Sequence, residues 1–199
     1  MDFADRYLAE CQELIQQLDR GAIERLAATL RATREAGGRL FILGVGGSAA
    51  NAAHAVNDFR KLAGIESYAP TDNVAELTAR INDEGWQSAF AGWLQVSRLH
   101  AEDMVLVLSV GGGSEETSVS PNLVQALRFA KSVGCRTGGI VGRDGGFTAQ
   151  TADVTVIVPT VNPDHVTPHT EAFQAVLCHL LITHPALKAA PTRWESLGL

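Results

Sequence analysis

Apolar residues recur along the chain in two patterns, as short continuous runs and as longer stretches at helical spacing. The run that begins at Met104 is apolar through Leu108, which is typical of a parallel strand buried on both faces. Runs and stretches alternate, which favours an α/β three-layer sandwich with a central parallel sheet. Strands are predicted at 39–44, 66–69, 104–109, 136–141 and 154–158, and helices at 48–62, 74–81, 86–96, 121–132 and 168–183.

Two further helices, at 3–19 and 23–36, are predicted before the first strand, with Gly21 between them. Their apolar stripes would suit either the sheet or a partner subunit, and we interpret the pair as an oligomerisation hairpin. Thr71 and Asp72 are predicted to cap the helix at 74–81, and 82–85 to form a turn. The whole chain, 1–199, is expected to be one domain with N-terminal helices at 1–37, an α/β core at 38–184 and a tail at 185–199 that forms a surface strap.

Composition narrows the class of protein. Of 199 residues, 46% are hydrophobic and 19% charged, and the net charge is −6, which describes a globular domain without a basic surface for nucleic acid. We find neither a signal-peptide pattern nor an apolar run of membrane-spanning length, so no membrane partner is expected. Cys11, Cys135 and Cys178 are odd in number and far apart, which favours a reducing, cytoplasmic location.

Two polar loops follow predicted strands. Gly44, Gly46 and Gly47 come after the first strand and precede a predicted helix at Ser48, so this turn is either a phosphate site or an ordinary strand-to-helix connection. A second loop, 109–120, is rich in serine and glycine and follows the strand at 104–109. Serines commonly cap helices or form turns, but two such loops at one sheet edge favour phosphate binding. The dinucleotide and nucleoside triphosphate motifs are missing, which argues against those ligands.

Histidines and carboxylates are the remaining candidates for chemistry. His54 and Asp58 are four residues apart, so they share one helix face and suit a metal, an acid–base pair or a local hydrogen bond. His179 lies in an apolar stretch, where a core histidine is the default interpretation. These residues leave an isomerase, a metal-dependent lyase and a sugar-phosphate sensor open. The region of the last helix holds His165, His169, Glu171, His179 and His184.

Taken in order, these motifs resemble the sugar isomerase (SIS) domain and, more narrowly, the phosphoheptose isomerases. The resemblance rests on the Gly-Gly-Ser turn, His54, the loop with Ser109 and Ser114, and the Gly-Arg-Asp-Gly-Gly sequence at 142–146, and it covers nearly the whole chain. It implies a SIS-type, flavodoxin-like fold and an aldose–ketose isomerase that acts on a phosphosugar. The substrate implied first is sedoheptulose 7-phosphate, converted to D-glycero-D-manno-heptose 7-phosphate through an enediol.

The resemblance also implies roles for particular residues, a homotetramer and one zinc ion per subunit. Asp58 would be the general base and His179 the acid. The metal ligands would be His54, Asp58, Glu171 and His179. The substrate-binding residues would be Val45, Gly46, Gly47, Ser48, Asp58, Asn82, Asp83, Ser109, Val110, Gly111, Ser114 and Glu171.

Several positions depart from the family pattern. Val45 replaces asparagine, Gly111 replaces serine, Asp58 replaces glutamate and Glu171 replaces glutamine, and about six residues at 115–120 resemble an insertion. Glu171 and His179 are eight residues apart, about 12 Å along a straight helix, so both reach one ion only if it lies between them. A non-catalytic SIS sensor or adaptor, and an isomerase of another sugar phosphate, therefore stay open.

Overall fold

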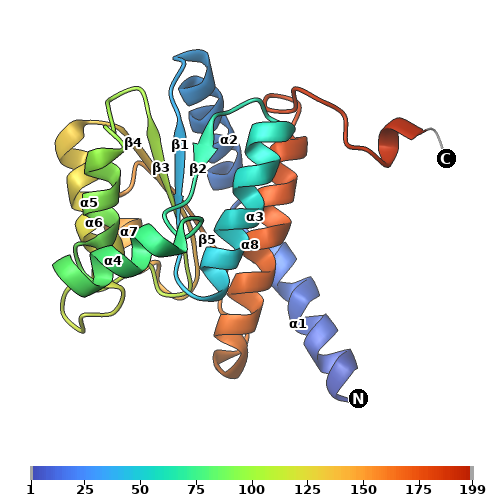
Figure 1. The fold of residues 1–199 in the computed structure, drawn as a ribbon. Helices are drawn as coiled ribbons and strands as arrows, with labels where there is room; N and C mark the ends of the chain where they lie inside the picture. Colours follow the sequence, from blue (N-terminus) through green and yellow to red (C-terminus); the bar gives the residue numbers. More distant parts are fainter. Residues whose placement is uncertain (1, 198–199) are drawn as a thin grey trace.

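Five parallel strands form the central sheet in a computed structural model of the protein, which describes residues 2–197 (Figure 1). Their order across the sheet is β2-β1-β3-β4-β5, so strands are added toward one edge up to β2 and toward the other edge from β3 onward, and the switch point lies between β1 and β3. Ligands of such sheets bind at this switch point, beyond the carboxyl ends of the strands. The strands are β1 (Leu40–Leu43), β2 (Ser67–Tyr68), β3 (Met104–Ser109), β4 (Arg136–Val141) and β5 (Val154–Ile157).

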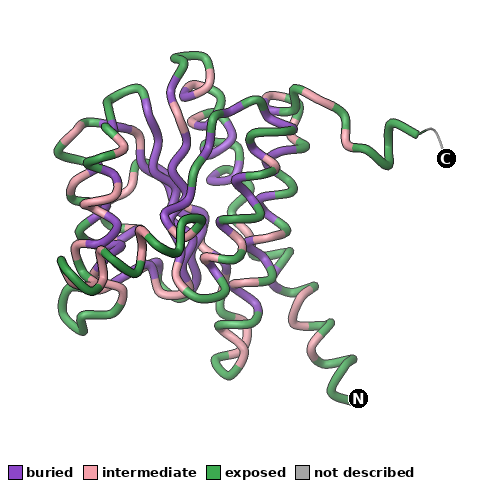
Figure 2. Tube along the Cα trace, in the orientation of Figure 1, coloured by how far each residue is buried: buried purple, intermediate pink, exposed green. Residues whose placement is uncertain are grey.

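Helices cover both faces of the sheet, which confirms the predicted three-layer sandwich. One face packs on α2 (Arg20–Glu35), α3 (Gly47–Lys61) and α8 (Val166–Thr183). The other packs on α5 (Ala89–Val96), α6 (Pro121–Val133) and α7 (Gly146–Thr151), with α4 (Val74–Glu84) against α5. Successive strand residues point to opposite faces, so Ile42 joins the first core and Leu43 the second. Figure 2 shows the buried sheet between partly exposed helices.

The two N-terminal helices differ in their packing. α2 lies against β4 and β5 and buries residues such as Leu26 and Leu30, so it belongs to the α/β core. In α1 (Phe3–Gln17), Leu14 is the sole buried residue, and its N-terminal half projects from the body (Figure 1). An oligomerisation role therefore stays a prediction for α1, whereas α2 covers the sheet. No helix in the described part of the chain is long and apolar enough to cross a membrane.

Some predicted boundaries are wrong. α2 begins at Arg20 because Asp19 accepts from the backbone N–H of Ala22, so Gly21 lies in its first turn rather than between two helices. α4 is capped by Asn73, not by Thr71 and Asp72. It also continues through the predicted turn at 82–84, because Arg80 pairs with Glu76 and Glu84 on neighbouring turns. The sequence did not predict α7 or the short 3₁₀ helix Pro163–His165, which are too short to show periodicity.

The segment after α8 is fastened to the body over only part of its length. Arg34 donates to the carbonyl oxygens of Ala63, Ala186 and Leu187, and Leu187 is fully buried. Further on, Trp194 is 74% exposed and precedes a 3₁₀ helix, Glu195–Leu197, that stands away from the body (Figure 1). The predicted surface strap thus applies to the first residues of the tail.

A buried ion pair joins the amino ends of β1 and β3. The carboxylate of Asp103 is fully buried. Its Oδ1 accepts from the backbone N–H of Arg39 at 2.8 Å, and its Oδ2 accepts from Nη2 of Arg39 at 2.8 Å and from the backbone N–H of His100 at 3.0 Å. The hydrogen bonds that Arg39 donates to Asp103 raise the pKa of its guanidinium above its usual range. This pair therefore fixes the two central strands relative to each other at the edge opposite the switch point.

We expect Asp103→Asn to lower the free energy of unfolding by about 2–3 kcal/mol, because the Arg39 guanidinium loses its charged partner in a buried place. The measurement is the urea midpoint at fixed protein concentration. Glu35→Gln is the matched control, because Glu35 and Arg31 are 3.6 Å apart and more than half exposed. The Glu35→Gln variant should lose less than about 0.5 kcal/mol of the free energy of unfolding. Equal losses in the two variants would contradict the structural role of Asp103.

Candidate active site

The turn after β1 brings the backbone of α3 close to the strand. A Cβ atom at Gly44 would lie 2.4 Å from the carbonyl oxygen of Ser48, so only glycine fits there. Gly46 has a φ of 62° and caps α3. Gly46 and Gly47 are exposed, Val45 is partly buried against the α5 side of the core, and Ser48 is buried. The surface of this turn is therefore glycine backbone at a helix N-terminus.

The serine loop after β3 is held by backbone contacts. Ser109 Oγ accepts from the N–H of Gly112 at 3.0 Å. On the other side, the carbonyl oxygen of Gly112 accepts from the backbone N–H of Thr148 at 3.0 Å and from its hydroxyl at 2.7 Å. A Cβ atom at Gly112 would lie 1.9 Å from the carbonyl oxygen of Gly145. The glycine-rich 142–146 segment thus supports the serine loop by close backbone packing.

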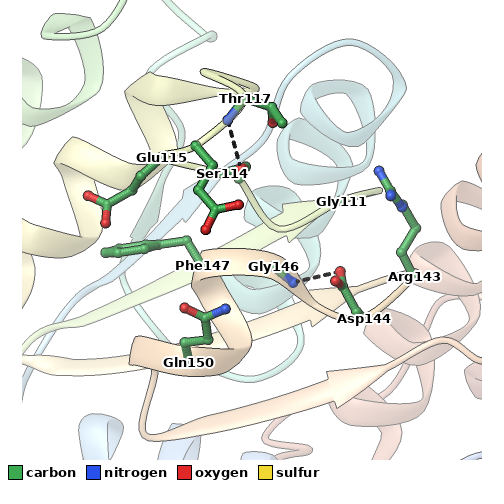
Figure 3. Close-up of a pocket in the computed structure, with 11 residues that line it drawn as sticks. Gly111, Ser114, Glu115, Thr117, Arg143, Asp144, Gly146, Phe147 and Gln150 are labelled. Atoms are coloured by element: carbon green, nitrogen blue, oxygen red, sulfur yellow. Dashed lines mark hydrogen bonds between the residues drawn. The ribbon is translucent and has the colours of Figure 1, made fainter.

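A cavity of about 400 Å³ opens beside this loop (Figure 3). Ser114 and Thr117 lie on one side of it and Arg143 on the other, with Phe147 and Gln150 from α7 below them. Arginine suits a phosphate because its planar guanidinium donates two parallel hydrogen bonds. We did not single out Arg143 from the sequence, although it is the one basic residue of the Gly-Arg-Asp-Gly-Gly motif at 142–146.

Three carboxylates border the same cavity, and two have partners. Glu115 forms an ion pair with Arg128, and Asp144 accepts from the backbone N–H of Gly146 at 3.2 Å. Glu116 is the third. The part of the loop that resembles an insertion therefore contributes negative charge to the rim, so an anion is favoured mainly near Arg143 and the backbone of Gly111.

His54, Asp58 and His179 converge on the outer side of α3 and α8. Nε2 of His54 lies 3.0 Å from Nε2 of His179 and 3.1 Å from Oδ2 of Asp58, and this Oδ2 is 3.5 Å from Nε2 of His179. The two histidine side chains are 58% and 53% exposed, and Asp58 is 14% exposed. Ligand atoms of a tetrahedral zinc ion lie about 3.3 Å apart, so both the spacing and the donor set fit such an ion.

Contacts between α3 and α8 bring this group together. The side-chain amide of Asn51 donates to the carbonyl oxygen of Glu171 at 2.8 Å and to Oε1 of Gln174 at 3.1 Å. A Cβ atom at Gly47 would lie 2.4 Å from Oε2 of Glu171, so the carboxylate sits directly over the first turn of α3. A negative charge is favourable at a helix N-terminus.

The predicted site residues occupy separate places. His54, Asp58 and His179 form one group, and Ser109, Val110, Gly111 and Ser114 form the serine loop. Glu171 lies over Gly47 rather than with the histidines, and Gly47 and His54 are seven positions apart, about 10 Å along α3. Asn82 and Asp83 are exposed on α4, where Asn82 donates to Asp83 at 2.7 Å. Their assigned roles stay predictions.

The default interpretation of His179 as a core residue is wrong, because its side chain is 53% exposed. Helix α8 is apolar on two sides. Phe173 and Leu177 face the sheet, whereas Val176 and Leu180 are 51% and 40% exposed. Val176 and Leu180 therefore place exposed apolar side chains on the same helix as His179.

The buried cysteines take no part in the site. Burial raises the pKa of the Cys178 thiol to about 12, and the charge of the nearby Asp58 adds to this effect. Burial likewise raises the pKa of the Cys135 thiol to about 12. Both groups are therefore protonated at neutral pH and are poor nucleophiles and metal ligands.

The chain was compared with protein-family models and with known proteins. The family model of the SIS domain matches residues 6–142. The chain is 30% identical over 182 residues to the phosphoheptose isomerase of Syntrophotalea carbinolica, a match that covers 87% of each chain. It is 34% identical over 179 residues to the phosphoheptose isomerase of Geobacter sulfurreducens, covering 85% of this chain and 88% of that one.

A solved structure of phosphoheptose isomerase from Neisseria gonorrhoeae has the same fold, with a TM-score of 0.76 at 23% identity over 89% of this chain and 92% of that one. The chain therefore belongs to the SIS domain family. Within that family its relatives are phosphoheptose isomerases, a class of phosphosugar isomerase, which confirms the resemblance drawn from the sequence.

We expect Gly112→Ala to destabilise the protein by at least about 2 kcal/mol, because the new Cβ would collide with the backbone of Gly145. Gly134→Ala is the matched control. Gly134 also has a positive φ, 81° against 71°, but no atom of the described residues lies within 4 Å of its added Cβ. The control should cost only the left-handed strain, about 1 kcal/mol. Urea unfolding of both variants measures the difference in the free energy of unfolding. Similar losses in the two variants would contradict close backbone packing between Gly112 and Gly145.

Proposed function

We propose that the protein interconverts sedoheptulose 7-phosphate and D-glycero-D-manno-heptose 7-phosphate through an enediol, in the cytoplasm. The observation that carries this proposal is the convergence of His54, Asp58 and His179 in a chain whose relatives are named phosphoheptose isomerase. A carboxylate and an imidazole within one group supply the base and the acid that an aldose–ketose isomerisation needs.

The reaction moves a proton between two neighbouring carbons and needs no outside oxidant. Asp58 takes the proton from C1 of the ketose, electrons shift to form the enediol, and the same proton returns to C2. His179 gives a proton to the carbonyl oxygen at C2 and accepts the proton from the hydroxyl at C1. We assign these transfers to Nδ1, because Nε2 of His179 faces His54 and Asp58. Oδ2 of Asp58 faces the histidines, whereas Oδ1 accepts from the amide of Asn57 at 2.9 Å, so we assign the proton transfer to Oδ1. The reacting carbon must come within about 3 Å of this atom.

Zinc fits the proposed site. His54, Asp58 and His179 would hold the ion, and zinc when bound polarises a carbonyl and stabilises negative charge on oxygen. We assign Glu171 to the substrate, because its carboxylate lies at the glycine turn with Gly46 and Gly47. Hydroxyl groups of the sugar are suitable partners for this carboxylate and for glycine N–H groups.

We place the phosphate of the substrate in the serine-loop cavity, between Ser114 and Arg143. This cavity shares no lining residue with the His54 group. A second copy of the chain is therefore proposed to bring its own His54 group to the loop, in a homotetramer. The exposure of His54, His179, Val176 and Leu180 supports this arrangement, because all four lie on the outer face of α3 and α8.

We expect Asp58→Asn to reduce kcat by about 10²–10⁴-fold with little change in phosphosugar binding, because the amide cannot take the proton. The assay is conversion of sedoheptulose 7-phosphate, with zinc added and after chelation. Asp72→Asn, an exposed carboxylate on the loop before α4, is the matched control and should keep full activity. Chelation should lower the rate of the unmodified protein.

Other outcomes separate the alternatives. Phosphosugar binding without turnover, with and without zinc, would mean a sensor or adaptor rather than an enzyme. Turnover of a different ketose phosphate would retain the chemistry but replace the substrate. Full activity in Asp58→Asn would assign the base to another residue.

A further inference from the structure

Glu10, His165 and His169 form a second group of ligand-type side chains, outside the site described above. Oε2 of Glu10 lies 2.8 Å from Nδ1 of His165 and 2.8 Å from Nε2 of His169. The three atoms all lie within 4.8 Å of one another. Glu10 comes from α1, and the two histidines come from the first turn of α8 and the residue before it (Figure 1).

This second group is distinct from the His54 group. His169 and His179 are both on α8 but ten residues apart, which is about 15 Å along the helix. The partner helix also differs, because the His54 group involves α3 and the second group involves α1. One metal ion cannot contact both groups.

Neighbouring side chains hold these ligands in place. The amide of Asn162 donates to Oε1 of Glu10 at 2.7 Å and lies 3.1 Å from Nδ1 of His165. Sγ of Cys11 lies 3.9 Å from Nδ1 of His169, and the ring of Tyr7 lies 4.5 Å from the ring of His169. Such outer contacts orient metal ligands and raise metal affinity.

The group is shielded but keeps one open side. The side chain of His169 is 3% exposed, that of Glu10 18% and that of His165 24%. A cavity of about 270 Å³, lined also by Phe3 and Arg6, adjoins Glu10 and His165. A water molecule from the cavity would complete a four-ligand set.

We propose that Glu10, His165 and His169 bind a divalent transition metal, with zinc the best fit, which fastens α1 to α8. Two imidazoles and one carboxylate suit zinc, whereas magnesium and calcium prefer oxygen ligands alone. Tetrahedral zinc requires ligand atoms about 3.3 Å apart, so the 2.8 Å contacts need to open by only about half an ångström. Because Leu14 is the sole buried residue of α1, such a bridge contributes much of the docking of this helix.

The test is zinc binding by the full chain in a His54→Gln/His179→Gln background, which lacks the first group. Isothermal titration should detect one zinc ion per chain, and the melting temperature should rise with zinc concentration. Adding Glu10→Gln or His165→Gln should weaken this binding at least about 100-fold and abolish the thermal shift. The unmodified protein should bind two zinc ions per chain. This readout does not depend on isomerase activity, so its failure is separate from failure of the proposed function.

His184→Gln is the matched control, because Nε2 of His184 pairs with Glu24 at 3.1 Å near the other end of α8 and this pair has no third ligand among residues 2–197. It should leave zinc binding unchanged. A folded background protein that binds no zinc would overturn the proposal and make the second group a metal-free hydrogen-bond network. Zinc binding that survives Glu10→Gln, His165→Gln and His169→Gln together would also overturn it, because the ion would then lie elsewhere.

Discussion

The packing of α3 against α8 is the interaction on which the candidate chemistry depends. Both helices lie on one face of the sheet, and they meet where Gly47 lacks a side chain and Asn51 donates to α8. This close approach near the N-terminal ends of α3 and α8 determines which of their residues face each other farther along the two helices. About two turns later the same pairing sets His54 opposite His179, with Asp58 beside them. A side chain at position 47 would displace Glu171 first and alter this alignment.

The two ends of the parallel strands differ in the contacts that they make. At the amino ends of β1 and β3, the buried Asp103–Arg39 pair fixes the strands with charge-assisted hydrogen bonds. At the carboxyl ends, contacts are made by glycine backbone, as between Gly112 and Gly145. Backbone packing of this kind leaves N–H groups and small hydroxyls at the surface and keeps bulky side chains away. A phosphosugar needs such a surface, and strands buried on both faces hold it rigid.

The sequence predicted most of the fold and part of the site, for physical reasons. All five strands were found, and β3 gave the clearest signal because a strand buried on both faces is a continuous apolar run. The His54–Asp58 pair was visible because four residues make about one helical turn. Contacts between distant segments leave no such signal. Glu10 is separated from His169 by most of the chain, and the burial of Ser48 depends on how α3 meets the sheet. Arg143 was hidden because its role depends on the fold of the neighbouring loop.

The exposure of the His54 group limits how the single chain can work. Two imidazoles that are more than half exposed interact with water and salt, which weakens both metal binding and proton transfer. The serine-loop cavity differs from the His54 group in both respects. It encloses space for a ligand, but no histidine is among the residues that line it. The His54 group therefore lacks an enclosed cavity, and the serine-loop cavity lacks histidines. The proposed assembly through the apolar outer face of α8 would remove water from the histidines and bring the proposed phosphate site to them, so under this proposal a polar substitution on that face disrupts assembly and activity together.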